Sequence, residues 1–371
     1  MSRIKRMLFG GLAALLAALA PAVETAAQQL LAGADFVTRF DNREYSGNRF
    51  NTSQTLFSAR LTPYVGLAWA EKNRLVVGVE LLQHFGQHNG EREAFLSDVK
   101  PLMYYRFATD RVQAAAGIFD RSELSGDYSP AFFSDSTRFY QNRIAGFLGR
   151  YRSAERRDTY IEMALDWEGM LGETTREKFR ILSAGRYTLD RGFYFGYAFS
   201  LFHFAMSQTV DNVSDNLLLN PYAGWQFSAY FDFDVRANLL FAPQRGRSLD
   251  HRWRKPCGGQ LDIAIRRWGV KLENNLYLGA NLQPLRYAVA DPATGLTYGT
   301  DGLYAGDSFY ATTEHLYNRT WLGYERRFFH DTVGVEAGIA LHYDGVGLGT
   351  QQVVKLSVNF EKLFGRKNET R

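Results

Sequence analysis

The amino-acid sequence predicts an all-β protein, a transmembrane antiparallel up-and-down β-barrel of about 16 strands, with 14 or 18 strands as alternatives. Three observations predict this fold. Segments in which apolar and polar residues alternate recur along the chain, aromatic residues are abundant, and the connections alternate between short and long. Each observation alone fits a water-soluble β-protein, but together they favour a barrel whose outer face contacts lipid.

The stretch 192–204, GFYFGYAFSLFHF, shows the alternation most clearly. Phe193, Phe195 and Phe199 share one file with other large apolar residues, and small or hydroxylated residues dominate the other file. Successive side chains point to opposite faces of a strand, so this period of two indicates a strand and not a helix. The segments that we expect to form strands are 30–41, 55–70, 74–86, 99–108, 111–120, 143–153, 158–168, 176–188, 191–206, 216–230, 233–243, 258–267, 269–282, 311–328, 332–344 and 350–364.

The composition excludes several other classes of protein. Aromatic residues make up 15% of the 371 residues, whereas a mean hydropathy of −0.29 is too polar for a bundle of transmembrane helices. The single cysteine, Cys257, offers neither a disulfide framework nor a cysteine-rich metal cluster, so we expect no cofactor and no metal. A net charge of +4 gives no reason to expect a nucleic-acid partner.

The first 27 residues have the pattern of a secretory signal peptide. The basic stretch MSRIKR precedes the short apolar run MLFGGLAALLAALA, and small residues follow before a cleavage site that we place after Ala27. The alternative is an uncleaved helix that anchors the chain. The pattern predicts three parts, namely a signal peptide at 1–27, the barrel at 28–364 and a polar tail at 365–371, in a protein exported to the outer membrane.

The connections between the expected strands alternate in length. Tight connections such as AEKN, ATDR and TLDR alternate with long ones such as DNREYSGNRFNTSQ and QTVDNVSDN. Outer-membrane barrels have short turns on the periplasmic side and long loops outside. An even strand number with both ends in the periplasm puts every tight connection on the periplasmic side. The segment from Gln283 to Tyr310 is where an error in the strand count is most expected.

Two stretches carry a resemblance to known proteins. VVKLSVNFEKLF resembles the terminal strand that the barrel-assembly machinery recognises in Gram-negative outer-membrane proteins, with Phe360 or Phe364 as the signal residue. GIFDRSELSGDYSPAFFSDSTRFY resembles a segment of uncharacterised Bacteroidetes-type barrel proteins. As a whole the chain resembles porins in its layout. This resemblance implies a porin-like barrel with outer-membrane lipid, the assembly machinery and small hydrophilic solutes as partners, and it is compatible with a homo-oligomer.

The polar files suggest how the lumen is lined. Five arginines on the fourth, sixth and eighth strands form a candidate basic ladder that would tune ion selectivity. The alternative is that these charges pair with carboxylates on a wet wall. The candidate pore-lining residues are Arg106, Arg150, Arg152, Arg180 and Arg186.

The third long connection, 120–141, is a candidate constriction loop. In porins, which the chain resembles, the third outer loop folds into the lumen. We expect Asp127 and Asp135 of this loop to face Arg106, Arg150 or Arg186 across the pore, although a surface loop is the alternative. The candidate carboxylates are Asp120, Glu123, Asp127 and Asp135.

The sequence shows no catalytic constellation. Among the seven histidines, we single out His203 with Ser207, which are four residues apart and therefore on the same face of a strand. We therefore predict a channel for passive diffusion of small hydrophilic solutes and not an enzyme. A plugged barrel that acts as an adhesin or an envelope-assembly component is the alternative, and an outer-membrane lipid hydrolase is the least favoured interpretation.

Overall fold

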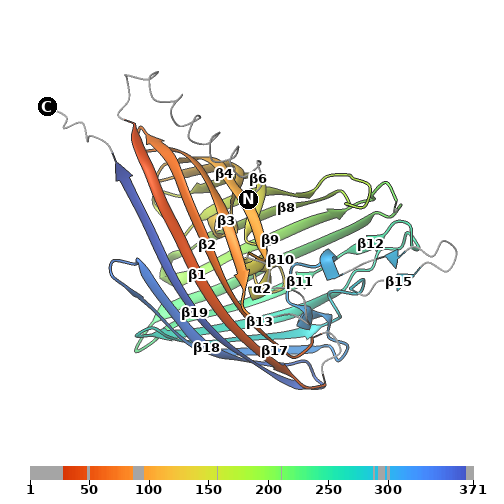
Figure 1. Cartoon of the computed structure of the whole chain (residues 1–371). Coiled ribbons are helices and arrows are strands. Elements are labelled where there is room, and N and C mark those ends of the chain that lie inside the picture. Colours follow the sequence, from red (N-terminus) through yellow and green to blue (C-terminus); the bar gives the residue numbers. More distant parts are fainter. Residues whose placement is uncertain are drawn as a thin grey trace.

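The chain folds into a closed antiparallel barrel, shown by a computed structural model in Figure 1. The structure describes residues 28–47, 51–86, 96–156, 158–209, 211–286, 289–290, 297–298 and 301–364. The barrel sheet has 17 strands, of which the short β12 continues the path of β11, since both pair with β10. The wall is therefore 16 strands around, as the sequence predicts, and the alternatives of 14 and 18 are wrong.

The strands follow one another around the barrel in chain order. They are β1 (Gln29–Tyr45), β2 (Gln54–Trp69), β3 (Asn73–His84), β4 (Asp98–Ala108), β5 (Val112–Asp120), β6 (Arg143–Arg152), β7 (Tyr160–Gly169), β8 (Lys178–Thr188), β9 (Phe193–Phe204), β10 (Ser214–Ser228), β11 (Asp232–Phe241), β12 (Gln244–Gly246), β13 (Cys257–Arg267), β14 (Val270–Gly279), β17 (Leu316–Phe328), β18 (Val333–Tyr343) and β19 (Leu348–Phe364).

The first and last strands close the wall. β1 pairs with β19 from Leu30 opposite Phe364 to Tyr45 opposite Gly349, and its other edge pairs with β2. Figure 1 shows these two strands side by side, red beside blue. Hydrocarbon offers no hydrogen-bond partner to a peptide group, so a sheet that crosses a membrane must leave no open edge.

The two faces of each strand differ as the alternation predicts, with one departure. On β9, Phe193 and Phe195 are 48% and 52% exposed on the outer face. The inner file holds Ala198 and Ser200, but it also buries the large ring of Phe202. That ring is covered because segments connecting the strands fill the lumen on this side and pack against it.

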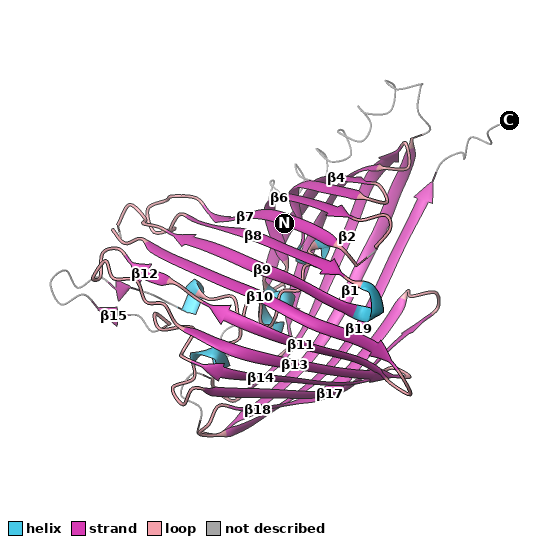
Figure 2. Ribbon diagram, turned by 180° about the vertical axis from the view of Figure 1, so that it is seen from behind, coloured by secondary structure: helices cyan, strands magenta, loops and turns pink. Residues whose placement is uncertain are grey.

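Short turns and long connections lie at opposite ends of the barrel, as Figure 2 shows from behind. The short connections, such as 70–72 and 109–111, lie at the end where β1 begins and β19 ends. On β19, Phe360 and Phe364 are exposed at this end, where their role as an assembly signal remains a prediction.

None of the helices in the described part of the chain is long and apolar enough to cross a membrane. The predicted signal peptide and the tail at 365–371 lie outside the described residues.

The described residues of the long segment between β14 and β17 add no strand to the wall. Its two short strands, β15 (Val289–Ala290) and β16 (Thr297–Tyr298), pair only with each other among the described residues. Two 3-10 helices follow, η3 (Asp301–Leu303) and η4 (Ser308–Ala311). Phe309 and Tyr310 of η4 are buried against Tyr277 and Tyr317 of the wall. This connection therefore occupies part of the lumen.

A charge on the outer face tests the membrane-spanning wall. Leu322 lies at the middle of β17 with 56% of its surface exposed, whereas Val112 begins β5 beside a short turn. We expect Leu322→Arg to lower the free energy of unfolding by about 2–4 kcal/mol, because lipid solvates a guanidinium poorly, and Val112→Arg to lower it by roughly 0–1 kcal/mol. Urea titration in lipid vesicles measures both values. Equal losses for the two variants would contradict the assigned membrane depth.

Candidate functional site

The connection between β5 and β6 folds into the barrel. At its start, the Asp120 carboxylate accepts a hydrogen bond at 2.8 Å from the Ser122 N–H and so caps the 3-10 helix η1 (Arg121–Glu123). The buried Arg121 side chain then forms an ion pair at 2.7 Å with Asp166 of β7. These contacts hold the beginning of the loop against the inner wall.

Asp127 lies further along the loop and contacts four wall strands, including β7 through the Tyr160 hydroxyl. It accepts a hydrogen bond at 2.7 Å from the Tyr222 hydroxyl of β10. Its carboxylate also lies 3.8 Å from Arg186 of β8 and 3.7 Å from Arg236 of β11. A carboxylate in such a position needs cationic partners because an unpaired charge away from water is costly. The loop is therefore pinned across the lumen at this residue.

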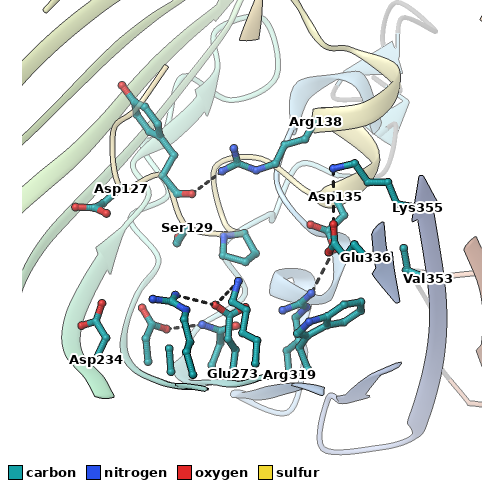
Figure 3. A pocket seen from close by; sticks show the side chains of 18 of the residues that line it. Asp127, Ser129, Asp135, Arg138, Asp234, Glu273, Arg319, Glu336, Val353 and Lys355 are labelled. Carbon is teal, nitrogen blue, oxygen red and sulfur yellow. Dashed lines mark hydrogen bonds and ion pairs between the residues drawn. The ribbon is translucent and has the colours of Figure 1, made fainter. Parts of the chain in front are cut away.

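The loop ends in the helix α2 (Asp135–Tyr140). The Ser134 hydroxyl caps it by accepting a hydrogen bond at 3.1 Å from the Thr137 N–H. Asp135, in the first turn, forms an ion pair at 3.3 Å with Arg319 of β17, as Figure 3 shows. Arg39 of β1 donates a hydrogen bond at 3.1 Å to the Asp135 carbonyl oxygen. α2 is thus held against strands on both sides of the β1–β19 seam.

Electrostatics keep the Asp135 carboxyl ionised. Burial alone would raise its pKa, but the positive charges of Arg319, Arg39 and Arg138 outweigh this effect and lower the pKa to about 2. A lowered carboxyl pKa means that the ion pair is complete above the ordinary value of 3.8 and is lost only as the pH falls through about 2. The contacts of α2 with the wall should therefore persist at mildly acidic pH.

A second connection joins the loop in the lumen. The Ala305 carbonyl oxygen accepts hydrogen bonds from the Ser134 N–H at 2.9 Å and from the Thr137 hydroxyl at 2.7 Å. The Asp307 N–H donates at 2.8 Å to the Pro130 carbonyl oxygen. We call the two segments together, residues 121–142 and the described residues 280–286 and 301–312, the lumen plug. The plug is a bonded unit and not two separate surface loops.

Cavities remain on both sides of the lumen plug. One of about 530 Å³ and one of about 480 Å³ share Arg60, Arg138 and Lys355 in their linings. A third, of about 320 Å³, is lined by residues near the long-connection ends of β1 and β2. Asp135 lines both the first and the third cavity. The region around this carboxylate is therefore where the two sides approach one another.

The five arginines of the predicted basic ladder face inward but do not form a row of free charges. Arg106 lies 3.6 Å from Glu123, Arg150 lies 3.4 Å from Glu162, and Arg180 lies 3.0 Å from Glu168. Arg186 forms an ion pair with Asp127. Arg152, the last residue of β6, lies opposite Tyr160, the first residue of β7. Arg106 lines the cavity of about 480 Å³, whereas Arg150 also donates to Ser125 of the plug. The effect of these residues on ion selectivity remains a prediction.

The structure brings together part of the expected constriction. Asp127 faces Arg186, as the sequence suggested. Asp135 faces Arg319 of β17 in place of Arg106, Arg150 or Arg186, because α2 crosses the lumen to the opposite wall. The two remaining loop carboxylates stay near β4 to β6, where Asp120 pairs with Arg143 and Glu123 with Arg106.

A serine and a histidine meet at the rim of the wall, beside α2. The Ser58 Oγ of β2 lies 2.7 Å from the Nδ1 of His84, its register partner on β3. The Tyr140 hydroxyl lies 3.2 Å from the same Oγ and covers it, so Ser58 is fully buried while His84 is exposed. Sequence inspection missed this pair because the two residues are 26 positions apart. Pairing the predicted strands 55–70 and 74–86 as a hairpin would have found it.

The pair chosen from sequence, His203 and Ser207, is not brought together as a catalytic dyad. β9 ends at Phe204, and the Ser207 hydroxyl beyond it lies 3.2 Å from the Thr209 hydroxyl. The Nδ1 of His203 instead lies 3.5 Å from Asp215 of β10. Among the described residues, no group of three His, Cys, Asp or Glu side chains is placed to hold a metal ion.

Comparison with known proteins identifies a family. The family model described as Lipid A 3'-O-deacylase-type matches residues 22–281, which is well over half of the chain. The chain belongs to the Lipid A 3'-O-deacylase-type family. A search of curated proteins found no match. The predicted resemblance to Gram-negative outer-membrane barrels is confirmed, and we treat the chain as an outer-membrane barrel.

Solved structures resemble this family member in fold. A loop-deletion mutant of OmpT, an outer membrane protein of Vibrio cholerae, is 9% identical, with 91% of this chain and 100% of that chain covered at a TM-score of 0.50. The outer membrane protein opdK from Pseudomonas aeruginosa is 10% identical, with coverages of 90% and 99% at a TM-score of 0.48. At 9% identity the likeness to the OmpT mutant shows the barrel fold alone.

The family overturns one prediction made from sequence. The expectation that the chain is not an enzyme is wrong, because the family that matches it is a deacylase-type family. The expectation rested on the absence of a catalytic motif. Strand pairing creates a hydrogen-bonded Ser–His pair that no short motif encodes.

The pinning of the plug by Asp127 can be tested by substitution. We expect Asp127→Asn to make local opening of the loop easier by about 1–3 kcal/mol, because Arg186 and Arg236 lose a charged partner. Hydrogen–deuterium exchange of peptides from 121–141 measures this change. Asp190→Asn is the matched control, since the Asp190 side chain is 93% exposed in the short connection between β8 and β9. Unchanged exchange in Asp127→Asn would show that apolar packing alone holds the loop.

Proposed function

We propose that the protein hydrolyses an acyl ester of a lipid in the outer leaflet of the outer membrane, with Ser58 and His84 as nucleophile and base. The 2.7 Å contact between Ser58 Oγ and His84 Nδ1 carries the proposal, because a serine hydroxyl becomes a useful nucleophile only with a base in hydrogen-bond reach. Membership of the Lipid A 3'-O-deacylase-type family supports the ester of lipid A as the substrate.

The chemistry follows from these two side chains. His84 accepts the Ser58 hydroxyl proton as Oγ attacks the ester carbonyl carbon, and it returns that proton to the departing sugar oxygen. Water, deprotonated by the same imidazole, then releases the fatty acid and restores the serine hydroxyl. The Tyr140 hydroxyl lies 3.2 Å from Oγ, close enough to donate a hydrogen bond to an oxyanion that forms beside it.

The position of the pair suits a membrane substrate. Phe57 and Phe85 are the sequence neighbours of Ser58 and His84, and side chains alternate, so these rings lie on the outer face. They are 44% and 48% exposed, and their ring centroids lie 4.6 Å apart. An acyl chain in the membrane can therefore lie against this apolar pair while its ester reaches over the rim to Ser58.

Two cations hold the last turn of α2 beside the pair. Lys100 donates a hydrogen bond at 2.7 Å to the Tyr140 carbonyl oxygen, and Arg60 donates at 2.7 Å to the Phe139 carbonyl oxygen. Positive charge at a helix C-terminus is favourable because the final carbonyl groups lack intrahelical partners. These contacts position Tyr140 over Ser58 and so control access to the hydroxyl.

Substitution of the pair tests the proposal. We expect His84→Gln and Ser58→Ala each to reduce ester hydrolysis by about 10²–10⁴-fold, because each removes proton transfer or the nucleophile. Purified protein is mixed with lipid A in detergent micelles, and mass spectrometry follows the loss of one acyl chain. His330→Gln is the control, since His330 is exposed in the short turn between β17 and β18, at the opposite end of the barrel from the pair.

The outcomes separate the roles of the two residues. Full activity in His84→Gln contradicts the proposal outright. Full activity in Ser58→Ala with loss in His84→Gln shows that the base acts on water, and the assignment of Ser58 as nucleophile then fails. Circular dichroism and heat-modifiable gel migration confirm that each variant still forms the barrel.

A narrow channel is a second candidate function, favoured by the cavities that meet at Asp135. In this interpretation small hydrophilic solutes pass between α2 and the β1–β19 wall. Asp135 and Arg319 would then set a transverse field at the narrowest level.

Bilayer recordings test the channel. Replacing Asp127 and Asp135 together by Asn should shift ion selectivity toward anions. The substitution removes two negative charges from the lumen, while the positive charges of the wall arginines remain. Shortening the loop 121–141 should raise single-channel conductance. If purified protein gives no conductance steps, and the shortened loop gives none either, the channel interpretation is wrong.

A further inference from the structure

A row of outward-facing side chains crosses the wall near the extracellular ends of the strands. In the strand register Trp167 lies opposite Phe179, Phe179 opposite His203, His203 opposite Asp215, and Asp215 opposite Arg245. Register partners share a face of a sheet, so these residues form one continuous row, which we call the rim row. Its members lie close to the long-connection ends of their strands.

The first half of the rim row is aromatic. The rings of Trp167 and Phe179 stack at 5.3 Å with an interplanar angle of 15°, and the ring of His203 lies 5.0 Å from Phe179. Trp167 is 41% exposed on the lipid-facing side. Aromatic rings with a polar edge favour the boundary between hydrocarbon and headgroups. The rim row therefore lies at the headgroup level of the outer leaflet.

The second half of the rim row holds two oriented guanidinium groups. The Asp215 carboxylate accepts hydrogen bonds from the Arg245 Nε at 2.7 Å and from the Arg247 Nε and Nη2, both at 2.9 Å. Arg245 also lies 4.6 Å over the ring of Trp253. One carboxylate between two guanidiniums leaves an excess of positive charge. Arg247 keeps 45% of its side chain exposed, so this charge faces the surroundings.

The connection that follows reinforces the positive charge. Counting the rim row with residues 247–255, five basic side chains stand against two acidic ones, a net charge of +3. Arg252 and Lys255 are exposed, and Arg254 forms an ion pair at 3.0 Å with Asp250. The basic residues are Arg245, Arg247, Arg252, Arg254 and Lys255, and the acidic residues are Asp215 and Asp250.

We propose that the rim row, together with Arg247, binds a phosphate group of a lipid headgroup in the outer leaflet. Guanidinium groups match phosphate oxygens with paired hydrogen bonds, and Asp215 fixes the two groups in advance. The aromatic half contacts the upper acyl chains of the same lipid. Charge complementarity selects a phosphorylated lipid, and the depth of the row excludes a ligand that stays in bulk water.

This surface is separate from the proposed ester-hydrolysing pair. Ser58 and His84 lie on β2 and β3, whereas the rim row lies on β7 to β12, several strands away around the wall. The proposal therefore depends on the barrel lying in the outer membrane and not on hydrolysis. Binding and hydrolysis can fail independently.

The experiment compares variants in lipid binding. Protein carrying His84→Gln, which prevents turnover, is titrated in detergent micelles with bisphosphorylated lipid A, and bound lipid is counted by native mass spectrometry. We expect the double variant Arg245→Gln with Arg247→Gln to bind the lipid about tenfold more weakly. A basic residue near an anionic lipid raises the binding affinity roughly fivefold, and the negative charge of Asp215 offsets part of this gain. The control is Arg326→Gln with Arg327→Gln, which removes the same charge at the periplasmic end of β17.

Two further measurements decide between an organised site and general attraction. Asp215→Asn raises the positive charge but frees the two guanidiniums, so we expect weaker binding, and tighter binding overturns the proposal. Dephosphorylated lipid A should bind no better to the parent protein than to the double variant. The proposal is also overturned if the β17 control weakens lipid binding equally. It is overturned as well if inorganic phosphate alone displaces the lipid at equal concentration.

Discussion

Closure of the sheet is the constraint on which the rest of the structure depends. A peptide group in hydrocarbon finds no solvent partner, so every strand must pair on both edges, and β1 must meet β19. Closure creates an enclosed lumen, and the lumen gives the long connections a place to pack away from water. The inward loop and the ion pairs of Asp127 and Asp135 are consequences of that enclosure. The outer face, by contrast, is left to lipid, where the exposed rings of β9 lie.

Local sequence patterns predict the wall well because the membrane imposes them locally. A lipid-facing file must be apolar at every second residue, so a stretch such as 192–204 identifies itself without knowledge of its neighbours. The alternation of short and long connections then determines the strand number. The inner file is less regular because its partners come from the lumen plug. Phe202 faces inward for this reason, against the small or hydroxylated file that the sequence suggested.

The candidate sites depend on pairings that short stretches of sequence do not contain. Asp135 and Arg319 are 184 positions apart, so their ion pair follows from the path of α2 across the lumen. Ser58 and His84 are closer, but their contact requires the register of β2 against β3. The inward loop could be expected from its ordinal position and its acidic and aromatic residues. The arginine partner of each loop carboxylate could not be predicted from sequence, except that Arg186 was among the expected partners of Asp127.

The bonded contact between the two halves of the lumen plug also bears on the order in which the protein forms. Thr137 and Ala305 are 168 positions apart, and their hydrogen bond joins a connection from the first half of the chain to one from the second. Contacts so distant in sequence close late, since the entropy lost on closing a loop grows with its length. During assembly the early strands therefore exist with an unfilled interior. The β1–β19 seam joins residues still further apart in sequence, so by the same reasoning the two plug segments meet before the wall closes.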